Sequence, residues 1–205
     1  MHPCVSTRPG TKVTRQLETL NALLRSDPAH RGFPLYDEKP IIKGQRSILS
    51  LGEGRSTFIA RLLQKRAGAV GARPALPSIL AYDVAYDAAL AREYDVRFVR
   101  PRPKLSDHYV AGLFQDLDLR DPKGQRLQFD TIVSSWSLAY VVNNADVVQG
   151  RQILDRVIDH LKPGGALYLP GDWGLSERKM GPVLRELRET GRIRAYEPNG
   201  RALQR

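Results

Sequence analysis

The sequence predicts an α/β protein built on a doubly wound, mostly parallel sheet that ends in a C-terminal antiparallel hairpin. Short apolar runs typical of buried strands alternate along the chain with amphipathic helical segments, which is the pattern of a parallel sheet covered by helices. The first apolar run, at 48–51, ends in Gly52-Glu53-Gly54 directly before a helical pattern. This arrangement predicts a sharp turn from a buried strand into a helix.

The other elements follow in chain order from periodicity and turn residues. Strands are expected at 47–51, 79–82, 110–115, 129–134 and 166–169. Helices are expected at 12–25, from the glycine turn to about residue 66, and at 86–94, 151–161 and 176–190. Two short segments, 192–196 and 201–204, flank a turn sequence and predict the closing hairpin. We expect residues 1–43 to form an N-terminal helix and connection packed on a single α/β domain at 44–205.

Length and composition narrow the class of protein. The 205 residues fit one domain, and 41% apolar and 26% charged residues are ordinary for a globular chain. The single cysteine, Cys4, cannot form an internal disulfide, and no apolar run approaches the ~18 residues of a membrane helix. The N-terminus lacks the apolar core of a signal peptide, so a cytoplasmic protein without membrane contact is expected.

The formal net charge of +10 is the unusual bulk property. It favours either an anionic partner such as RNA or a surface of solvated charges, and the sequence leaves both interpretations open. Basic residues gather at 97–104 and at 178–205, where they could contact phosphates. The 4 histidines form no constellation with metal-ligand spacing, so no metal site is expected.

The glycine turn could hold a nucleoside-containing cofactor, because glycine lets a ligand approach bare backbone amides at a helix N-terminus. A phosphate-binding P-loop would need four residues between its glycines and then a lysine, and this chain has neither. A dinucleotide site would need a third glycine where Thr57 stands and an acid about 20 residues on. Asp83 instead lies 31 residues past Gly52, so an NAD-dependent Rossmann oxidoreductase is the second alternative.

Several separated segments together resemble the motifs of the class I S-adenosylmethionine-dependent methyltransferases. They are Ile-Leu-Ser-Leu-Gly-Glu-Gly at 48–54, the strand ending at Asp83, Phe-Gln-Asp-Leu at 114–117, Phe-Asp-Thr-Ile-Val-Ser-Ser at 129–135 and Leu-Lys-Pro-Gly-Gly at 161–165. The resemblance implies a Rossmann-like methyltransferase sheet that binds S-adenosyl-L-methionine. This chain departs from the family at Ser50, where an acid is usual, and at Ser56, where a small residue such as glycine is usual.

The resemblance also implies which residues contact the cofactor. Gly52, Glu53 and Gly54 would lie against its methionine part, with Glu53 near the ammonium group in place of the missing acid. Asp83 would accept hydrogen bonds from the ribose hydroxyls, with Asp87 as the alternative. From the residues alone, the same aspartate could instead cap a following helix.

Two further segments complete the expected site. Asp116 and Leu117 would contact the adenine, although Asp116 could also act only as a helix cap. Ser135 and Trp136 follow the fourth strand, whose end faces the reacting methyl group in the family. Trp136 could border the cofactor or the acceptor, or could simply pack in the core.

The methyl acceptor and the catalytic residues stay open at this point. The glycine turn with Phe58, Tyr86-Asp87 and Glu93-Tyr94 is loosely similar to uridine-N3 ribosomal RNA methyltransferase-like proteins, whereas the segment at 135–140 is closer to the small-molecule type. The expected activity is in-line methyl transfer to a small molecule or RNA. The first alternative is a non-catalytic module of the same fold that binds S-adenosylmethionine or RNA. The oligomeric state is left open.

Overall fold

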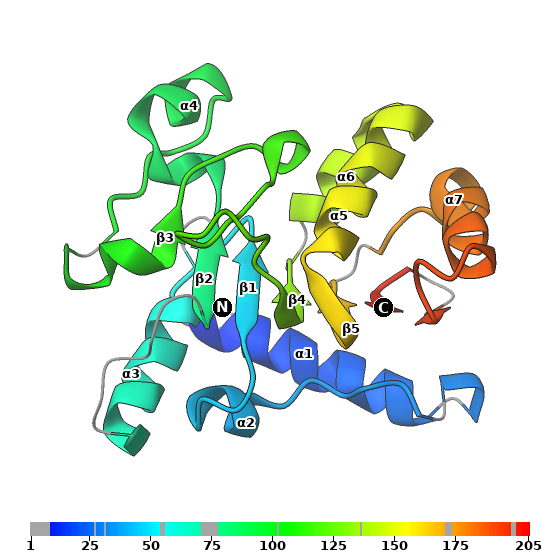
Figure 1. The fold of residues 1–205 in the computed structure, drawn as a ribbon, viewed down its shortest axis with the longest axis horizontal. Coiled ribbons are helices and arrows are strands. Elements are labelled where there is room, and N and C mark those ends of the chain that lie inside the picture. The colour runs from blue at the N-terminus through cyan, green and yellow to red at the C-terminus, as the bar shows by residue number, and fades with distance from the viewer. Residues whose placement is uncertain are drawn as a thin grey trace, which may run out of the picture.

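The computed structural model of the chain describes residues 9–26, 28–30, 32–53, 56–70, 78–101, 103–135, 137–170, 174–197 and 200–205. Within these residues, one sheet of seven strands has the order β3-β2-β1-β4-β5-β7-β6 (Figure 1). The strands β1 to β5 pair in parallel with one another, and β7 pairs antiparallel with both β5 and β6. These pairings confirm the predicted α/β fold with its mostly parallel sheet and antiparallel C-terminal hairpin.

Most strands lie close to the expected positions. The exceptions are β3, described below, and β5, which begins at Leu161 instead of residue 166 because Leu161 already pairs with Phe129 of β4. Their bounds are β1 Ile48–Leu51, β2 Ile79–Tyr82, β3 Tyr109–Val110, β4 Phe129–Val133, β5 Leu161–Tyr168, β6 Ala195–Tyr196 and β7 Ala202–Gln204. The chain moves outward from β1 through β2 to β3, then returns to place β4 on the other side of β1. This reversal next to β1 is the switch point at which open α/β sheets bind ligands.

Alternate side chains of each strand belong to two different apolar clusters. On β1, Leu49 and Leu51 lie in one cluster and Ile48 lies in the other. The same alternation separates Leu167 from its neighbours on β5. Because successive side chains of a strand point to opposite faces, the two clusters are the two faces of the sheet. Both faces are therefore buried, as the near-continuous apolar strands predict.

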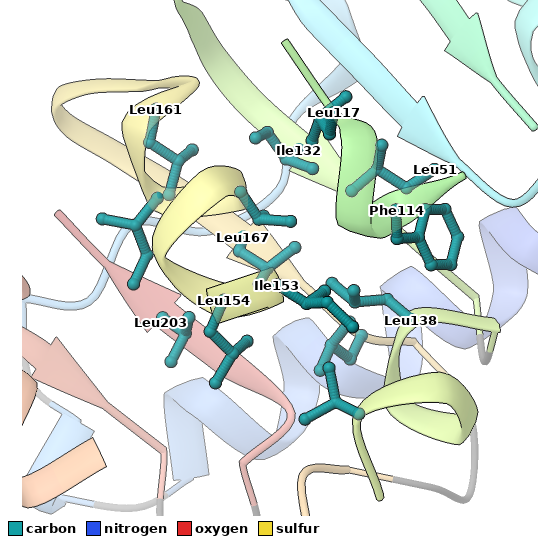
Figure 2. Packing of buried hydrophobic residues seen from close by; sticks show 14 of the residues in the cluster. Leu51, Phe114, Leu117, Ile132, Leu138, Ile153, Leu154, Leu161, Leu167 and Leu203 are labelled. Atoms are coloured by element: carbon teal, nitrogen blue, oxygen red, sulfur yellow. The ribbon is translucent and has the colours of Figure 1, made fainter. Parts of the chain in front are cut away.

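Helices cover both faces of the sheet (Figure 1). One face packs against residues of α1 Pro9–Ser26, α2 Glu38–Ile42 and α3 Phe58–Val70. The other packs against α5 Ser137–Asn144, α6 Val147–Asp159 and α7 Glu177–Glu189, as Figure 2 shows for Leu138, Ile153 and Leu154. A short helix, α4 Ala88–Glu93, follows β2. Short 3-10 turns complete the set: η1 Pro28–His30, η2 Val84–Tyr86, η3 Pro103–His108 and η4 Phe114–Asp116.

The N-terminal helix α1 contributes Val13, Leu17, Leu20 and Leu24 to the cluster that contains Ile48 of β1. The helix therefore packs on the sheet through the apolar face that its periodicity indicates. The expected division at residues 43 and 44 stays a prediction. No helix in the described part of the chain combines the length and apolar character needed to cross a bilayer.

The expected third strand, 110–115, is wrong in its second half. β3 contains only Tyr109–Val110, and Phe114–Asp116 forms the 3-10 turn η4. The hydroxyl of Tyr82 donates a hydrogen bond to the carbonyl of Leu113 at 2.9 Å, so this carbonyl is engaged away from the sheet. Phe114 then turns into the apolar cluster beneath α5 and α6 (Figure 2). A partner from a different strand therefore ends β3, which local propensity does not reveal.

Three helical regions also differ from expectation. α2 lies in the expected polar connection, α5 was not expected, and α6 begins at Val147 instead of residue 151. Asp146 accepts a hydrogen bond from the backbone amide of Gln149 at 2.8 Å and so caps α6. That aspartate was a usable N-terminal signal in the sequence.

Candidate functional site

The carboxyl ends of β1, β2 and β4 lie at one edge of the sheet because the strands are parallel. Gly52 and Glu53 follow β1, Asp83 follows β2, and Ser135 lies two residues beyond β4. The amide of Gly52 donates to the carbonyl of Tyr82 at 2.8 Å, which ties the first two strand ends together. The structure therefore gathers these sequence-predicted residues at the switch point of the sheet.

Position 52 requires a glycine, both for its backbone conformation and for the space around it. Its φ of +65° lies in the left-handed region that glycine tolerates best. A Cβ at this position would overlap the Ser137 hydroxyl at the start of α5 and lie 3.1 Å from the ring of Phe114. Ser137 also donates a hydrogen bond to the carbonyl of Gly52 at 3.2 Å. The absent side chain thus makes room for α5. Gly54, the other glycine of the turn, lies outside the described residues.

Glu53 is a buried carboxyl group that is only partly hydrogen-bonded. Its side chain is 7% exposed, and Oε1 accepts a hydrogen bond from the amide of Ile59 in α3 at 3.0 Å. Oε2 has no hydrogen-bond partner among the described residues. Burial raises the pKa of Glu53 to about 8, the amide of Ile59 opposes that shift, and the charge of Asp83 adds to it.

Two further polar side chains are buried beside Glu53. Asp83 accepts a hydrogen bond from the amide of Ala85 at 2.8 Å and so begins the η2 turn. Tyr86, at the end of that turn, has a buried hydroxyl with no partner among the described residues. Burial raises the pKa of the Tyr86 phenol, and the charges of Glu53 and Asp83 raise it further. We call these three residues, Glu53, Asp83 and Tyr86, the Glu53 cluster.

The two candidate ribose acids have different surroundings. Asp87 is half-buried, and its Oδ1 accepts hydrogen bonds from the amides of Ala89 and Leu90 at 2.8 and 2.9 Å. It is therefore the N-cap of α4. Asp83 also makes a capping hydrogen bond, but it is buried, and its charge raises the pKa of Glu53. Only Asp83 belongs to the Glu53 cluster.

The adenine candidates lie in and just after η4. Asp116 is exposed, whereas the side chain of Leu117 is buried in the apolar cluster (Figure 2). Leu117 can therefore offer a ligand only its backbone. The turn is held by Tyr82, whose hydroxyl bonds the carbonyl of Leu113, and burial raises the pKa of Tyr82 to about 12. The hydrogen bond from Tyr82 that holds the turn carrying Asp116 could not be predicted from the sequence.

The segment after β4 contains a small serine network. Ser134 accepts a hydrogen bond from the amide of Leu138 at 3.1 Å and lies 3.2 Å, between hydroxyl oxygens, from Ser137. These bonds begin α5 beside Gly52. Ser135 is half-buried between them, and Trp136 lies outside the described residues. Sequence reasoning missed Ser137, although a serine directly before an apolar segment is a helix-start signal.

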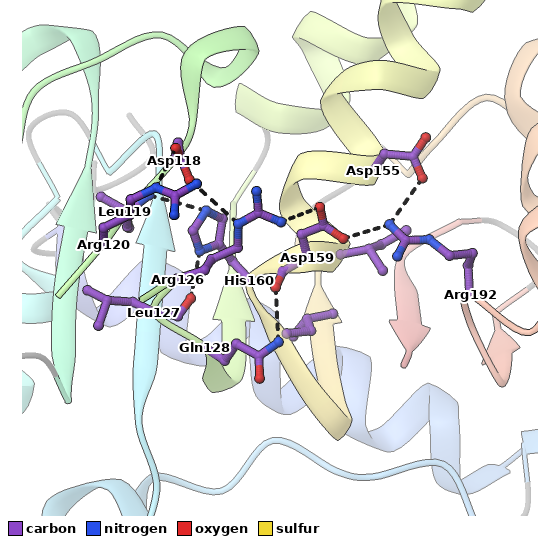
Figure 3. Close-up of polar contacts among 12 residues, drawn as sticks. Asp118, Leu119, Arg120, Arg126, Leu127, Gln128, Asp155, Asp159, His160 and Arg192 are labelled. Atoms are coloured by element: carbon purple, nitrogen blue, oxygen red, sulfur yellow. Dashed lines mark hydrogen bonds and ion pairs between the residues drawn. The ribbon is translucent and has the colours of Figure 1, made fainter. Parts of the chain in front are cut away.

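Much of the basic sequence at the C-terminal end is engaged within the protein. Arg192 forms ion pairs with Asp155 and Asp159 at 3.4 and 2.7 Å (Figure 3). Arg126 pairs with the same Asp159 at 2.6 Å and with Asp118 at 3.5 Å. Elsewhere in this region, Lys179 and Arg205 donate to backbone carbonyls and Arg188 lies over the ring of Tyr196. The surface open to phosphates is therefore smaller than the count of basic residues indicates.

His160 has a structural environment. It is fully buried, its Nε2 accepts from the amide of Leu119 at 3.3 Å, and Nδ1 lies 2.7 Å from the carbonyl oxygen of Leu127 (Figure 3). Since Nε2 accepts, Nδ1 carries the proton and donates it to Leu127. Burial lowers the pKa of His160 and keeps the ring neutral. Across the described residues, no group of three or more His, Cys, Asp or Glu side chains could hold a metal ion.

A scan against models of protein families and a search of curated proteins found no match to this sequence. Among solved structures, the sugar N-methyltransferase KedS8 from a Streptoalloteichus species is similar over 80% of this chain and 51% of its own, with 19% identity and a TM-score of 0.43. The SAM-bound amino pentose methyltransferase CalS10 from Micromonospora echinaspora is similar over 85% and 60%, with 19% identity and a TM-score of 0.38.

A third similar structure is magnesium protoporphyrin IX methyltransferase from Synechocystis, which has bound SAM. The similarity covers 100% of this chain and 84% of that one, with 11% identity and a TM-score of 0.43. The chain spans 51% and 60% of the lengths of KedS8 and CalS10.

Proposed function

We propose that this protein is a methyltransferase that binds S-adenosylmethionine at the carboxyl ends of β1, β2 and β4. The observation that carries the proposal is the Glu53 cluster, with two buried oxygen atoms that lack partners among the described residues. A buried polar atom without a partner costs about 1–3 kcal/mol, so a ligand that satisfies it would recover that energy. S-adenosylmethionine offers both cationic groups and ribose hydroxyls, and the acidic cluster fits this chemistry.

Each site residue has a proposed task. The Gly52 to Gly54 turn and Glu53 hold the methionine part, and Asp83 accepts from the ribose because Asp87 is engaged at α4. Asp116 accepts from the adenine amino group, and Leu117 contributes its backbone. Ser135 and Trp136 border the place where the acceptor enters. When bound, the cofactor supplies an electrophilic methyl group.

The protein contributes mainly alignment to this reaction. In-line transfer needs the nucleophile, the methyl carbon and the sulfur to lie on one line. Holding them in this alignment lowers the activation barrier by several kcal/mol. We assign no general base, because an acceptor that is already nucleophilic needs none. Incubation with methyl-labelled S-adenosylmethionine and a panel of small molecules and RNAs tests the activity. Label transfer supports the enzyme, while cofactor binding without transfer to any acceptor favours the non-catalytic module.

Replacing Asp116 by alanine is expected to weaken S-adenosylmethionine binding at least about tenfold, the loss of one charged hydrogen bond of about 1.5–3 kcal/mol. The fold should stay cooperative because Asp116 is exposed. Calorimetric titration measures the dissociation constant. Asp118→Ala is the matched control, since it removes an exposed acid two residues away that pairs with Arg120. Equal affinities for both variants and the parent chain would remove Asp116 from the site.

RNA is the second acceptor class, and the segment after α4 favours it. Tyr94 and Phe98 are 44% and 41% exposed there, and the exposed Arg97 and Arg100 alternate with them. Exposed aromatic rings can stack on unpaired bases while arginines contact phosphates. Single-stranded RNA should therefore bind with an affinity that falls steeply with salt.

Filter retention of labelled single-stranded RNA at increasing salt measures this dependence. The double variant Arg97→Gln with Arg100→Gln should reduce both the affinity and the salt slope. Lys12→Gln with Arg15→Gln removes the same charge from α1, which lies away from α4 in Figure 1, and should change retention less. Retention that is undetectable, or that salt does not change, argues for small-molecule acceptors.

A further inference from the structure

Glu53 is enclosed by residues of α3, β1, β2 and η2, and none of these elements offers it a cation among the described residues. From α3, the amide of Ile59 donates to Oε1. From β1 comes the buried side chain of Ser50, and from the end of β2 and η2 come Asp83 and Tyr86. Tyr109 of β3 lies behind Tyr86, with ring centroids 5.0 Å apart at 86°. Among the described residues, the ionisable groups that face Glu53 are thus acids and phenols.

A buried carboxyl group beside a second acid ionises less readily than one in water. Burial penalises its charge, and a negative charge nearby adds to that penalty. Asp83 has a stabilising amide of its own at Ala85. Burial and Asp83 together raise the pKa of Glu53 to about 8 against the opposing amide of Ile59. A pKa near 8 favours the neutral form of Glu53 near neutral pH, with the proton on Oε2 because Oε1 accepts from the amide of Ile59.

We propose that S-adenosylmethionine binding places a positively charged group beside Glu53 and releases the proton of Oε2 to solvent, so that cofactor affinity is coupled to pH. The inference rests on the proposed function. The O–H bond of the carboxylic acid breaks, the buffer takes the proton, and the carboxylate that remains pairs with the cation. Glu53 thereby acts as a proton-linked acceptor for the charge that the ligand carries.

The sign of the pH dependence follows from linkage. A cation nearby favours the ionised carboxylate, so the pKa of Glu53 is lower in the complex than in the free protein. Between those two pKa values, each unit of rising pH increases the cofactor association constant about tenfold. The pH range in which this dependence can be measured ends near pH 8, where an α-amino group such as the cofactor's own begins to titrate.

Calorimetric titration with S-adenosylmethionine at pH 6 and pH 7, in buffers of different ionisation enthalpy, counts the released protons. We expect close to one proton per cofactor and a dissociation constant that falls about tenfold between these pH values. S-adenosylhomocysteine shares the ammonium group and lacks the sulfonium charge. Equal proton release with both ligands assigns the cation to the ammonium group, and release with S-adenosylmethionine alone assigns it to the sulfonium.

Glu53→Gln keeps the shape of the side chain and cannot titrate. It should bind S-adenosylmethionine without proton release and with an affinity that does not change from pH 6 to pH 7. Asp146→Asn, the matched carboxyl-to-amide change at the cap of α6, should behave like the parent chain. An infrared band of a protonated carboxyl in the parent chain, lost on cofactor addition, tests the same step without a variant.

The outcomes separate the two proposals. Tight binding of S-adenosylmethionine with no proton release and no pH dependence overturns the role of Glu53 and leaves the proposed function standing. Absence of binding at every pH overturns the proposed function, and the role of Glu53 with it.

Discussion

Gly52→Ala is expected to lower the free energy of unfolding by ~2–5 kcal/mol and to weaken S-adenosylmethionine binding severely. The left-handed backbone at φ +65° costs an alanine about 1–2 kcal/mol. The added Cβ also overlaps Ser137, and overpacking of this kind costs typically about 1–3 kcal/mol. Relief of the overlap would displace the start of α5 from the edge that carries Glu53. Denaturant unfolding and calorimetric titration measure the two effects.

Gly124→Ala provides the matched control for this variant. Gly124 has φ +77°, and a Cβ there would meet no atom within 4 Å, so only the backbone cost applies. A double variant, Gly52→Ala with Ser137→Gly, removes the overlapping atoms and should recover the steric part of the loss. If Gly52→Ala and Gly124→Ala cost the same, then α5 does not depend on the missing side chain at position 52.

His160→Leu is expected to destabilise the protein by ~2–4 kcal/mol, because it leaves two buried backbone groups without partners. Those groups are the amide of Leu119 and the carbonyl of Leu127, which the imidazole now joins to the end of α6 (Figure 3). The segment they flank follows directly on Asp116 and Leu117, so cofactor affinity should fall as well. Denaturant unfolding at pH 7 measures the loss.

The same histidine gives stability a pH dependence with a defined sign. Burial lowers the folded pKa of His160 below 6.5, so the unfolded chain takes up a proton at a higher pH than the folded one. The free energy of unfolding should therefore fall as pH drops below 6.5, and His160→Leu should lack this contribution. His108→Leu is the control, because His108 is half-buried and bonds a single carbonyl, that of Ile79, at 2.8 Å. Equal losses for both variants would contradict the structural role of His160.

The sheet could be predicted because its signals are local. The apolar runs of β1, β2 and β4 are continuous, and each ends at a polar or glycine residue that marks the strand end. The hairpin of β6 and β7 was found for the same reason, since its turn residues lie between two short strands. By contrast, the end of β3 depends on a hydrogen bond between Tyr82 and Leu113, residues 31 apart in the sequence.

The candidate site was predictable as a set of acids and glycines, and its internal contacts were not. Nothing near Gly52 in the sequence indicates that Ser137, 85 residues later, fills the space beside it. The burial of Tyr86 beside Glu53 likewise arises only when β1 and β2 are paired. The number of basic residues likewise overestimated the basic surface open to a partner. Arg192 and Arg126 lie in different segments, and both form ion pairs with Asp159.

Calorimetric titration of the chain with S-adenosylmethionine, S-adenosylhomocysteine and NAD is the most direct test of the cofactor site. The site at the ends of β1, β2 and β4 predicts saturable binding of both adenosyl ligands, at one site per chain, and no binding of NAD. Saturable NAD binding without heat from either adenosyl ligand would contradict the account and favour a nucleotide-dependent oxidoreductase.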